Sequence, residues 1–335
     1  MSTLKEQIGL KALEPGTYTA QCANDFTLGP TIFGGAVSAI IFNAADTHLK
    51  TDAAAVKLDQ PDVYKMHVQF LRPCQAESVT IKVKPIKLGP LVSVFQVDLM
   101  QRDKLCCLAL ITSGNFDQAK GLTMRSETTL QPPPVGKPNL KAVEAHKVDK
   151  NWVAYTYKGD LVAITRRFHI LSPRTGYPIK GIADNWYRLR DDLESFHPTF
   201  LALMADILPS MADTLLNNHS VYDGTNNINR ANDYIASHPS SPPLAPLSNT
   251  IEDAMKGDIF SFTTTMDVEF RRKVPEDKNG LDWLFVRTAT DGVKDGRLYV
   301  ENMLCDEEGE VVVASRQLIL VLEAARKFQG SKASL

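Results

Sequence analysis

Apolar residues occupy every second position over long parts of this chain, which is the pattern of β-strands that bury one face. The alternation is plain in VTIKVK and VSVFQVDL, and turn sequences such as LGP and PEDKNG separate the segments. The pattern predicts strands at Tyr18–Ala23, Tyr64–Leu71, Ser78–Lys87, Leu91–Gln101, Leu105–Ser113, Trp152–Tyr157, Ala163–Ile170, Ile259–Arg272, Asp282–Thr290, Gly296–Cys305 and Val311–Leu322. Most of them form two antiparallel meanders.

Two segments have the pattern of helices. Residues 33–48 are apolar or small nearly all round, which predicts a helix that is buried on most sides. The spacing of apolar residues over 196–217 predicts a second helix. Its apolar face carries Leu201, Met204, Leu208 and Met211.

Two other stretches interrupt these patterns. The sequence QPPPVGKPNL at residues 131–140 has too many prolines for a helix or a central strand, so it predicts a linker. The polar stretch at residues 218–249 includes HPSSPPLAP. We expect it to form a loop with a short helix.

The first strand of each meander carries a similar motif. MHVQFLRP begins at Met66 and MDVEFRRK at Met266, so Met, Val, Phe and Arg recur at a spacing of 200 residues. Chance can produce such a match, but both motifs also follow a predicted helix and open a meander. We therefore predict two copies of one unit, each a helix followed by an antiparallel meander.

Composition and charge exclude several functional classes. The 335 residues suffice for two domains or one duplicated domain. A formal charge of −2 provides no general attraction for nucleic acid or an anionic membrane. No apolar run has the length of a membrane span, and the N-terminal residues lack the apolar core of a signal peptide. We expect a cytoplasmic protein, with the peroxisome as an alternative because the C-terminal KASL partly resembles the SKL signal.

The cysteines show neither a CxxC motif nor the spacing of a zinc site. In a reducing compartment we expect them to be small core residues, with a catalytic thiol as the alternative. They are Cys22, Cys74, Cys106, Cys107 and Cys305. No metal site, no cofactor and no serine nucleophile of the GxSxG type are expected.

Several short motifs, taken in their order along the chain, resemble one family. They include GPTIFGGAVSAIIFNAA, LALMADILPSM and DGRLYVENMLCDEEGEVVVASRQLIL. Together with the double layout, they resemble the thioesterase-like double-hotdog proteins related to type II acyl-CoA thioesterases. The resemblance covers residues 18–322, but it fails over 218–249 and is weak over 118–190.

This resemblance implies an α+β fold, the double hotdog. Each of its two tandem units is a long helix wrapped by a curved antiparallel sheet, and the two sheets join edge to edge, which covers edges that would otherwise be open. We expect an N-terminal hotdog at 1–130, the linker at 131–140, a C-terminal hotdog at 141–325 with the insertion at 218–249, and a tail at 326–335.

The resemblance also implies active residues in the second unit. The family pattern has an Asp on the second helix, a Thr on the next strand and a Gln on the last strand, which are Asp206, Thr263 and Gln317 here. Counting back from MDVEF selects Thr263 over Thr264 and Thr265, and a β-bulge is expected near Gln317 because the spacing there is short. These groups could orient a water and take its proton as it attacks a thioester carbonyl.

Gly34 and Gly35 come just before the first buried helix. Amides at a helix N-terminus could donate hydrogen bonds to the developing oxyanion, and glycines would let a substrate approach closely. The offset of 200 residues places Val63 opposite Thr263, and the first meander ends in LALITSG without a glutamine. We therefore predict one site per chain, built from second-unit side chains close to these glycines.

Each of these residues also has a purely structural interpretation. Asp206 could cap a neighbouring element, Thr263 is a common strand residue, and Gln317 could be a hydrogen-bonded core amide. The two glycines could simply permit tight helix packing. His67 and His169 are expected to be structural.

Hydrolysis of an acyl thioester is the leading hypothesis, with acyl-CoA or an acyl chain on a carrier protein as the substrate and partner. Two alternatives stay open. One is a hotdog-derived lyase, isomerase or cyclase that acts on a secondary-metabolite intermediate, and the other is a non-catalytic protein that binds an apolar ligand. No nucleic acid partner is expected. Assembly into a homo-oligomer is optional, because a duplicated chain already supplies a pair of hotdog units.

Overall fold

The computed structural model describes residues 2–21, 24–118, 121–124, 129–191, 194–207, 209–276 and 279–324. Cys22, Leu208 and the tail at 326–335, which ends in KASL, lie outside these ranges. Within the described ranges, no helix is both long and apolar enough to cross a membrane.

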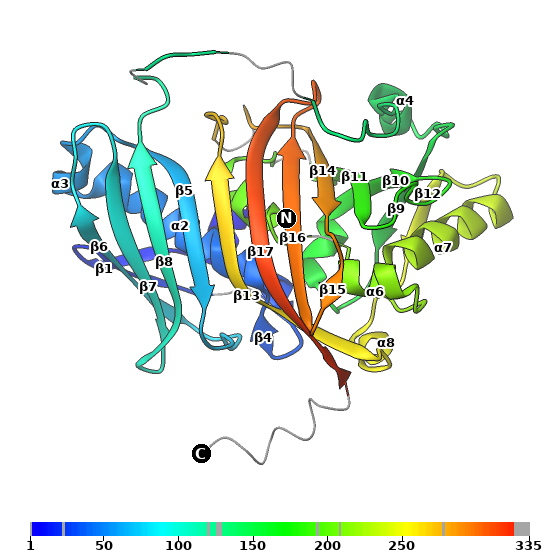
Figure 1. The fold of residues 1–335 in the computed structure, drawn as a ribbon, viewed down its shortest axis with the longest axis horizontal. Coiled ribbons are helices and arrows are strands. Elements are labelled where there is room, and N and C mark those ends of the chain that lie inside the picture. The colour runs from blue at the N-terminus through cyan, green and yellow to red at the C-terminus, as the bar shows by residue number, and fades with distance from the viewer. Residues whose placement is uncertain are drawn as a thin grey trace.

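The first half contributes one long helix and one end of a large sheet (Figure 1). Its helices are α1 (Leu4–Ile8), α2 (Gly34–Thr51) and α3 (Ala53–Val56), with the 3₁₀ turn η1 (Asn24–Phe26). Its strands are β1 (Lys11–Glu14), β2 (Thr17–Ala20), β3 (Thr27–Leu28), β4 (Thr31–Ile32), β5 (Asp62–Phe70), β6 (Val79–Lys87), β7 (Ser93–Gln101) and β8 (Lys104–Gly114).

The second half contributes the rest of the sheet and several shorter helices. Its helices are α4 (Leu140–Glu144), α5 (Pro198–Met204), α6 (Met211–Leu216), α7 (Gly224–Ser237) and α8 (Ile251–Met255), with the 3₁₀ turn η2 (Ala163–Arg167). Its strands are β9 (Trp152–Tyr157), β10 (Phe168–Pro173), β11 (Ile182–Leu189), β12 (Leu244–Leu247), β13 (Ile259–Phe270), β14 (Trp283–Ala289), β15 (Val293–Lys294), β16 (Arg297–Cys305) and β17 (Val311–Glu323).

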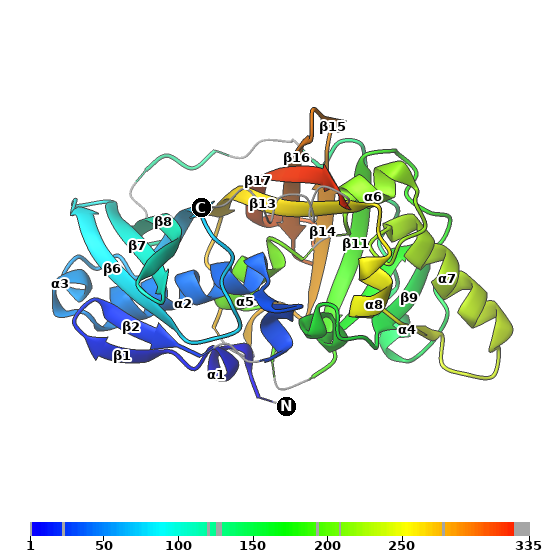
Figure 2. The ribbon, with the colours of Figure 1, turned by 90° about the horizontal axis from the view of Figure 1, so that it is seen from below.

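A single 15-stranded sheet runs through both halves in the order β1-β2-β6-β7-β8-β5-β13-β17-β16-β14-β11-β10-β9-β12, with β15 beside β16. Neighbouring strands are antiparallel except β9 and β12. The sheet curves, and Figure 2 shows α2 and α5 side by side on its concave face. The predicted α+β arrangement of two helix-and-meander units with sheets joined edge to edge is confirmed.

The MxVxF motifs form the joint between the two halves. β5 and β13 pair antiparallel, with Met66 opposite Val268, His67 opposite Asp267 and Val68 opposite Met266. The pairing is symmetric about the pair of His67 and Asp267, whose side chains also meet at 3.2 Å between Nδ1 and Oδ1. The repeat therefore marks two equivalent strands that lie against each other.

The main apolar core lies between the concave face of the sheet and the helices. α2 buries residues on every side, among them Val37, Ile40 and Phe42, which explains its lack of a polar face. α5 is likewise buried from Thr199 to Met204, including Phe200 and Leu203. Because apolar side chains from both halves belong to one cluster, burial favours the two units packing as one body.

The second predicted helix is shorter than expected. α5 ends at Met204 and α6 starts at Met211, so the prediction of one helix over 196–217 is wrong. Pro209 has no N–H and disfavours helical geometry in the residue before it. Ser210 then caps α6 by accepting from the Asp213 amide at 3.3 Å. The break places Ala205 and Asp206 just past the C-terminal end of α5 rather than inside a helix.

Two other predictions need correction. Residues Ala163–Arg167 form η2, so the strand predicted at 163–170 begins only at Phe168. Local hydrogen bonds compete with the extended form there, since Thr165 Oγ1 donates to the Val162 carbonyl at 2.7 Å. The stretch 218–249 holds the 14-residue helix α7 and the strand β12, which adds to the sheet beside β9.

Strand β11 was not predicted. Its centre carries Asp184 and Asn185, which are buried and hide the apolar alternation. Asp184 forms a bidentate ion pair with Arg287, with both contacts at 2.7 Å. A polar pair of this kind can be recognised only once the neighbouring strand β14 is known.

The proline-rich linker lies against the protein. Residues 131–139 contain no helix or strand. Trp152 Nε1 donates to the Gly136 carbonyl at 2.8 Å, and Val135 packs against a cluster on the convex face that includes Trp186 and Trp283. The domain boundaries at residues 130 and 141 stay a prediction.

Candidate functional site

The predicted active residues come from three elements that meet on the concave face. Thr263 lies on β13, Gln317 lies on β17, and Asp206 follows the last turn of α5. Thr263 Oγ1 donates to Gln317 Oε1 at 3.0 Å. The Gln317 side chain and the Gly35 amide both donate to the Asp206 carboxylate. The structure thus brings Asp206, Thr263, Gln317 and Gly35 together.

A β-bulge decides which threonine faces the site. Along β13, Thr263 pairs with Ile319 and Thr265 pairs with Leu318, so Thr264 is an extra residue. Strict alternation from the buried Met266 would point Thr263 to the convex face, but one extra residue reverses the alternation. Thr264 Oγ1 instead donates to the Leu318 carbonyl at 2.9 Å. The bulge therefore lies in β13, rather than beside Gln317 in β17.

The first half contains the same bulge. In the pairing of β5 with β8, Val63 pairs with Ser113 and Lys65 pairs with Thr112, so Tyr64 is the extra residue. Val63 is therefore the true counterpart of Thr263, in position and in orientation. It is 4% exposed and apolar, so the first half lacks this hydroxyl.

The surroundings of Asp206 favour a carboxyl that titrates near neutral pH. Burial raises the pKa of Asp206 to about 7, although the hydrogen bonds from Gln317 and from the Gly35 amide lower it. Asp206 still keeps part of its surface accessible to solvent. A carboxyl with such a pKa can take up and release a proton at neutral pH.

Gly34 and Gly35 allow the start of α2 to approach the end of α5. A Cβ on Gly34 would lie 2.7 Å from Asp206 Oδ2, and a Cβ on Gly35 would lie 2.6 Å from the Leu203 carbonyl oxygen. Both positions therefore require glycine for close packing. The Gly35 amide is engaged by Asp206, so its first role in this structure is to hold the carboxylate.

The Gln317 side chain fixes the direction of the hydrogen bonds that it makes with Ala205, Asp206 and Thr263. A Gln side chain has two N–H donors and one acceptor oxygen. One N–H goes to the Ala205 carbonyl at 2.8 Å, Asp206 accepts a hydrogen bond from the same side chain, and Oε1 accepts from Thr263. The Thr263 hydroxyl hydrogen is thereby used, which leaves the lone pairs of its oxygen available to accept.

Two polar residues near the site were not predicted. Asn302 on β16 and Ser315 on β17 also donate to the Ala205 carbonyl, each at 3.3 Å. The residues on the concave side of β16 are Leu298, Val300, Asn302 and Leu304. A single amide among apolar residues of one strand face is the sequence signal that could have identified Asn302.

The remaining histidines and cysteines are not part of this group. His67 lies at the joint between the halves and contacts Asp267. Cys74, Cys106, Cys107 and Cys305 are buried, as expected for core residues. Among the described residues, no three His, Cys, Asp or Glu side chains are grouped so that they could hold a metal ion.

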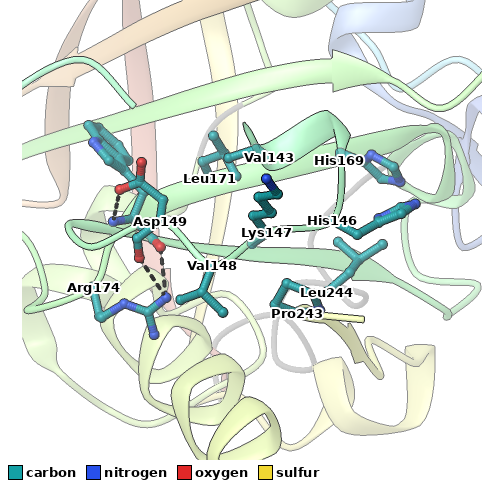
Figure 3. Close-up of a pocket in the computed structure, with 12 residues that line it drawn as sticks. Val143, His146, Lys147, Val148, Asp149, His169, Leu171, Arg174, Pro243 and Leu244 are labelled. Carbon is teal, nitrogen blue, oxygen red and sulfur yellow. Dashed lines mark hydrogen bonds between the residues drawn. The ribbon is translucent and has the colours of Figure 1, made fainter. Parts of the chain in front are cut away.

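A small pocket lies elsewhere, on the convex face of the second half (Figure 3). His169 and Leu171 of β10 line it, with His146 and Lys147 after α4. Its volume of about 30 Å³ can hold water but not an acyl chain. Burial and the nearby Arg190, Arg188 and His146 lower the pKa of His169 to about 4, so it is neutral at pH 7. None of the predicted active residues lines this pocket.

Comparisons with known proteins agree across both halves. Residues 23–114 match the family described as the acyl-CoA thioesterase N-terminal domain, and residues 140–321 match its C-terminal domain. The second match includes the stretch 218–249, where the motif resemblance had failed. The chain is also 24% identical over 349 aligned residues to the thioesterase-like protein TwmA of Talaromyces wortmannii, with 96% of this chain and 94% of that protein covered.

Solved structures share the fold. A protein of unknown function with a hot dog fold from Alicyclobacillus acidocaldarius superposes with a TM-score of 0.66 at 14% identity, covering 96% of this chain and 98% of that one. The acyl-CoA thioesterase II TesB2 of Mycobacterium marinum gives a TM-score of 0.57 at 17% identity, covering 96% and 97%. At such low identity these structures support the double-hotdog fold and nothing further.

Proposed function

The chain belongs to the acyl-CoA thioesterase family, and from this premise we propose that it hydrolyses acyl thioesters with a water molecule activated by Asp206 and Thr263 and oriented through Gln317. The observation that carries the proposal is the hydrogen-bonded chain from Thr263 through Gln317 to Asp206, beside the N-terminus of α2. Acyl-CoA and an acyl chain on a carrier protein are both substrates of this chemistry.

The directions of the hydrogen bonds support a position for the water between Thr263 and Asp206. The Thr263 oxygen can accept one hydrogen of a water, because its own hydrogen is donated to Gln317. The Asp206 carboxylate can accept the other hydrogen, because it acts only as an acceptor when ionised. A water held between these two acceptors presents a lone pair of its oxygen to the substrate carbonyl.

The reaction then proceeds with Asp206 as the general base. The water oxygen forms a bond to the thioester carbonyl carbon while Asp206 takes a water proton. The resulting oxyanion needs donors already in place. We assign this role to the Gly34 amide in the first turn of α2, since the Gly35 amide holds Asp206. The C–S bond then breaks, the thiolate receives the proton from Asp206, and the products are a carboxylic acid and a thiol.

Thiol release from a panel of acyl-CoA thioesters tests the proposal. The Asp206→Asn variant should lose about 10²- to 10⁴-fold in kcat, the usual contribution of a positioned general base. Thr263→Val and Gln317→Ala should also lose turnover, whereas Thr263→Ser should retain most of it. Asp267→Asn, on the convex face of the same strand, is the matched control and should behave like wild type. A folded wild-type protein that releases no thiol from any member of the panel would exclude hydrolysis.

Product mass separates hydrolysis from the alternatives. A carboxyl with a pKa near 7 can also remove a proton next to a carbonyl, so the same group of residues could serve a lyase or an isomerase. In that case the product would change while the thioester stays intact. Tight retention of an apolar ligand without any turnover, unaffected by Asp206→Asn, would instead indicate a binding protein.

A further inference from the structure

A row of polar side chains crosses the concave face of the second half. Thr288 of β14 is paired with Asn302 of β16, Asn302 is paired with Ser315 of β17, and Gln317 follows two residues later on the same strand face. Thr263 of β13 is hydrogen-bonded to Gln317 and ends the row. All except Thr263 are at most 3% exposed.

The first half has apolar residues at every equivalent position. The counterparts follow from strand pairing outward from the joint. Val68 pairs with Ala109 as Val268 pairs with Ser315, so Ala109 is the first-half counterpart of Ser315. Continuing across β7 and β6 gives Val97 for Asn302 and Val83 for Thr288. Ile111 corresponds to Gln317 and Val63 to Thr263 by the same pairing. The fold therefore accepts apolar residues at all of these positions.

Two of these polar side chains carry a buried atom that lacks a hydrogen-bond partner in the described part of the chain. Among the residues that the structure describes, Asn302 Oδ1 and Thr288 Oγ1 have no hydrogen-bond partner although both are buried. A buried polar atom without a partner destabilises a protein relative to an apolar replacement of the same shape. Folding stability alone gives no reason to keep an amide where the first half has Val97.

Three of these side chains meet at one backbone oxygen. Gln317 Nε2, Asn302 Nδ2 and Ser315 Oγ all donate to the Ala205 carbonyl, at 2.8, 3.3 and 3.3 Å. Asn302 Nδ2 also donates to Ser315 Oγ at 3.1 Å. Carbonyls in the last turn of a helix lack intrahelical partners, so one donor would satisfy this group. Three donors hold the residue before Asp206 far more tightly than capping requires.

We infer that Asn302 and Ser315 are positioning residues, which fix the end of α5 so that the Asp206 carboxylate stays within reach of Gln317, Thr263 and the start of α2. This inference rests on the proposed hydrolase function. Asn302 and Ser315 act through the Ala205 carbonyl and do not touch the reacting atoms. Their loss should leave substrate binding intact and reduce the fraction of time in which Asp206 is correctly placed.

The test replaces these residues by the ones that the first half uses. Asn302→Val and Ser315→Ala should each lower kcat about tenfold and together about a hundredfold, as expected when a catalytic group is misplaced by a fraction of an ångström to one ångström. KM should stay within about twofold in both variants, and the thermal midpoint of Asn302→Val should stay equal or rise because its unsatisfied amide oxygen is removed. Ser315→Thr, which keeps the hydroxyl, should retain most of the activity.

Thr288→Val provides the matched control. It removes a buried hydroxyl from the same row and installs the residue type of its first-half counterpart Val83, but Thr288 Oγ1 has no hydrogen-bond partner among the described residues, so it does not hold the Ala205 carbonyl. Its turnover should equal that of wild type. Wild-type kcat in Asn302→Val and Ser315→Ala, or a loss of kcat that parallels a loss of thermal stability, would overturn the inference.

A second measurement does not depend on turnover. The titration of Asp206, followed by ¹³C NMR of its carboxyl carbon, should shift to higher pH in the Asn302→Val and Ser315→Ala double variant, because the hydrogen bonds from Gln317 and Gly35 are weakened. An unchanged titration would overturn the positioning role. If the wild-type protein released no thiol, the hydrolase proposal would fail by itself, and this titration would still decide whether Asn302 and Ser315 position Asp206.

Discussion

Replacing Asp206 by Asn should lower kcat by about 10²- to 10⁴-fold and, at alkaline pH, stabilise the folded protein relative to wild type. Burial raises the pKa of Asp206 from its ordinary value of 3.8 to about 7, so ionising this carboxyl is disfavoured in the folded state. At about 1.36 kcal/mol per pKa unit, the difference corresponds to roughly 4 kcal/mol.

The direction in which folding stability changes with pH follows from the order of the folded and unfolded pKa values of Asp206. Since the folded pKa lies above the unfolded one, the stability that protonated Asp206 contributes is complete below pH ~4 and is lost as the pH rises through about 7. The Asp206→Asn variant has no carboxyl to ionise, so it escapes this loss. Relative to wild type, the variant should therefore gain roughly 4 kcal/mol between pH 4 and pH 8.

Thermal unfolding at the two pH values measures this gain. An unfolding entropy of about 2.1 cal/mol/K per residue amounts to roughly 0.7 kcal/mol/K for a chain of 335 residues, so the gain corresponds to about 6 °C in Tm. Asp267→Asn is the control, because it removes only surface ion pairs and should change Tm by less than about 2 °C. If the Tm difference between Asp206→Asn and wild type were the same at both pH values, the raised pKa would be refuted.

Three further predictions follow from the structure. The value of kcat/KM for thioester hydrolysis should fall with decreasing pH below an apparent pKa of about 7, because the general base must be ionised; a profile that is flat from pH 5 to 8 would exclude Asp206 as that base. Gly34→Ala should lower kcat about a hundredfold, since the added Cβ would lie 2.7 Å from Asp206 Oδ2, whereas Gly136→Ala, where a Cβ meets no atom within 4 Å, should match wild type in a thiol-release assay. Cys107 should resist alkylation by iodoacetamide at pH 7 in the folded protein, because it is 0% exposed and its pKa is raised by a hydrogen bond with Cys74 and by burial; rapid labelling, detected by mass spectrometry of peptides, would contradict this.

The alternating strands and the buried first helix could be predicted from the sequence because both depend on local periodicity, and the 200-residue repeat could be found because the same residues recur in the same register. Residues that face a core on one side must alternate, and a helix buried all round must be apolar all round. The family motifs then led to Asp206, Thr263 and Gln317, and the fold brings these three together. Their catalytic roles stay a prediction until turnover is measured.

Other features were decided by contacts between distant segments. The bulge at Thr264 turns Thr263 toward the site, yet a bulge exists only relative to a partner strand, here β17. The break after α5 depends on Pro209 and on capping by Ser210, and a long apolar pattern conceals it. Asn302 looks like an isolated polar residue until the Ala205 carbonyl lies 3.3 Å away.

The sequence by itself therefore determined most of the strands, the first helix, their order and their duplication. The tertiary structure decided how the two copies meet, which threonine faces inward, and which buried amides converge on the end of α5. The physical reason is that side-chain periodicity is set by neighbours along the chain. Register, bulges and buried hydrogen bonds are instead set by partners that lie tens to hundreds of residues away, such as Gln317 and Ala205.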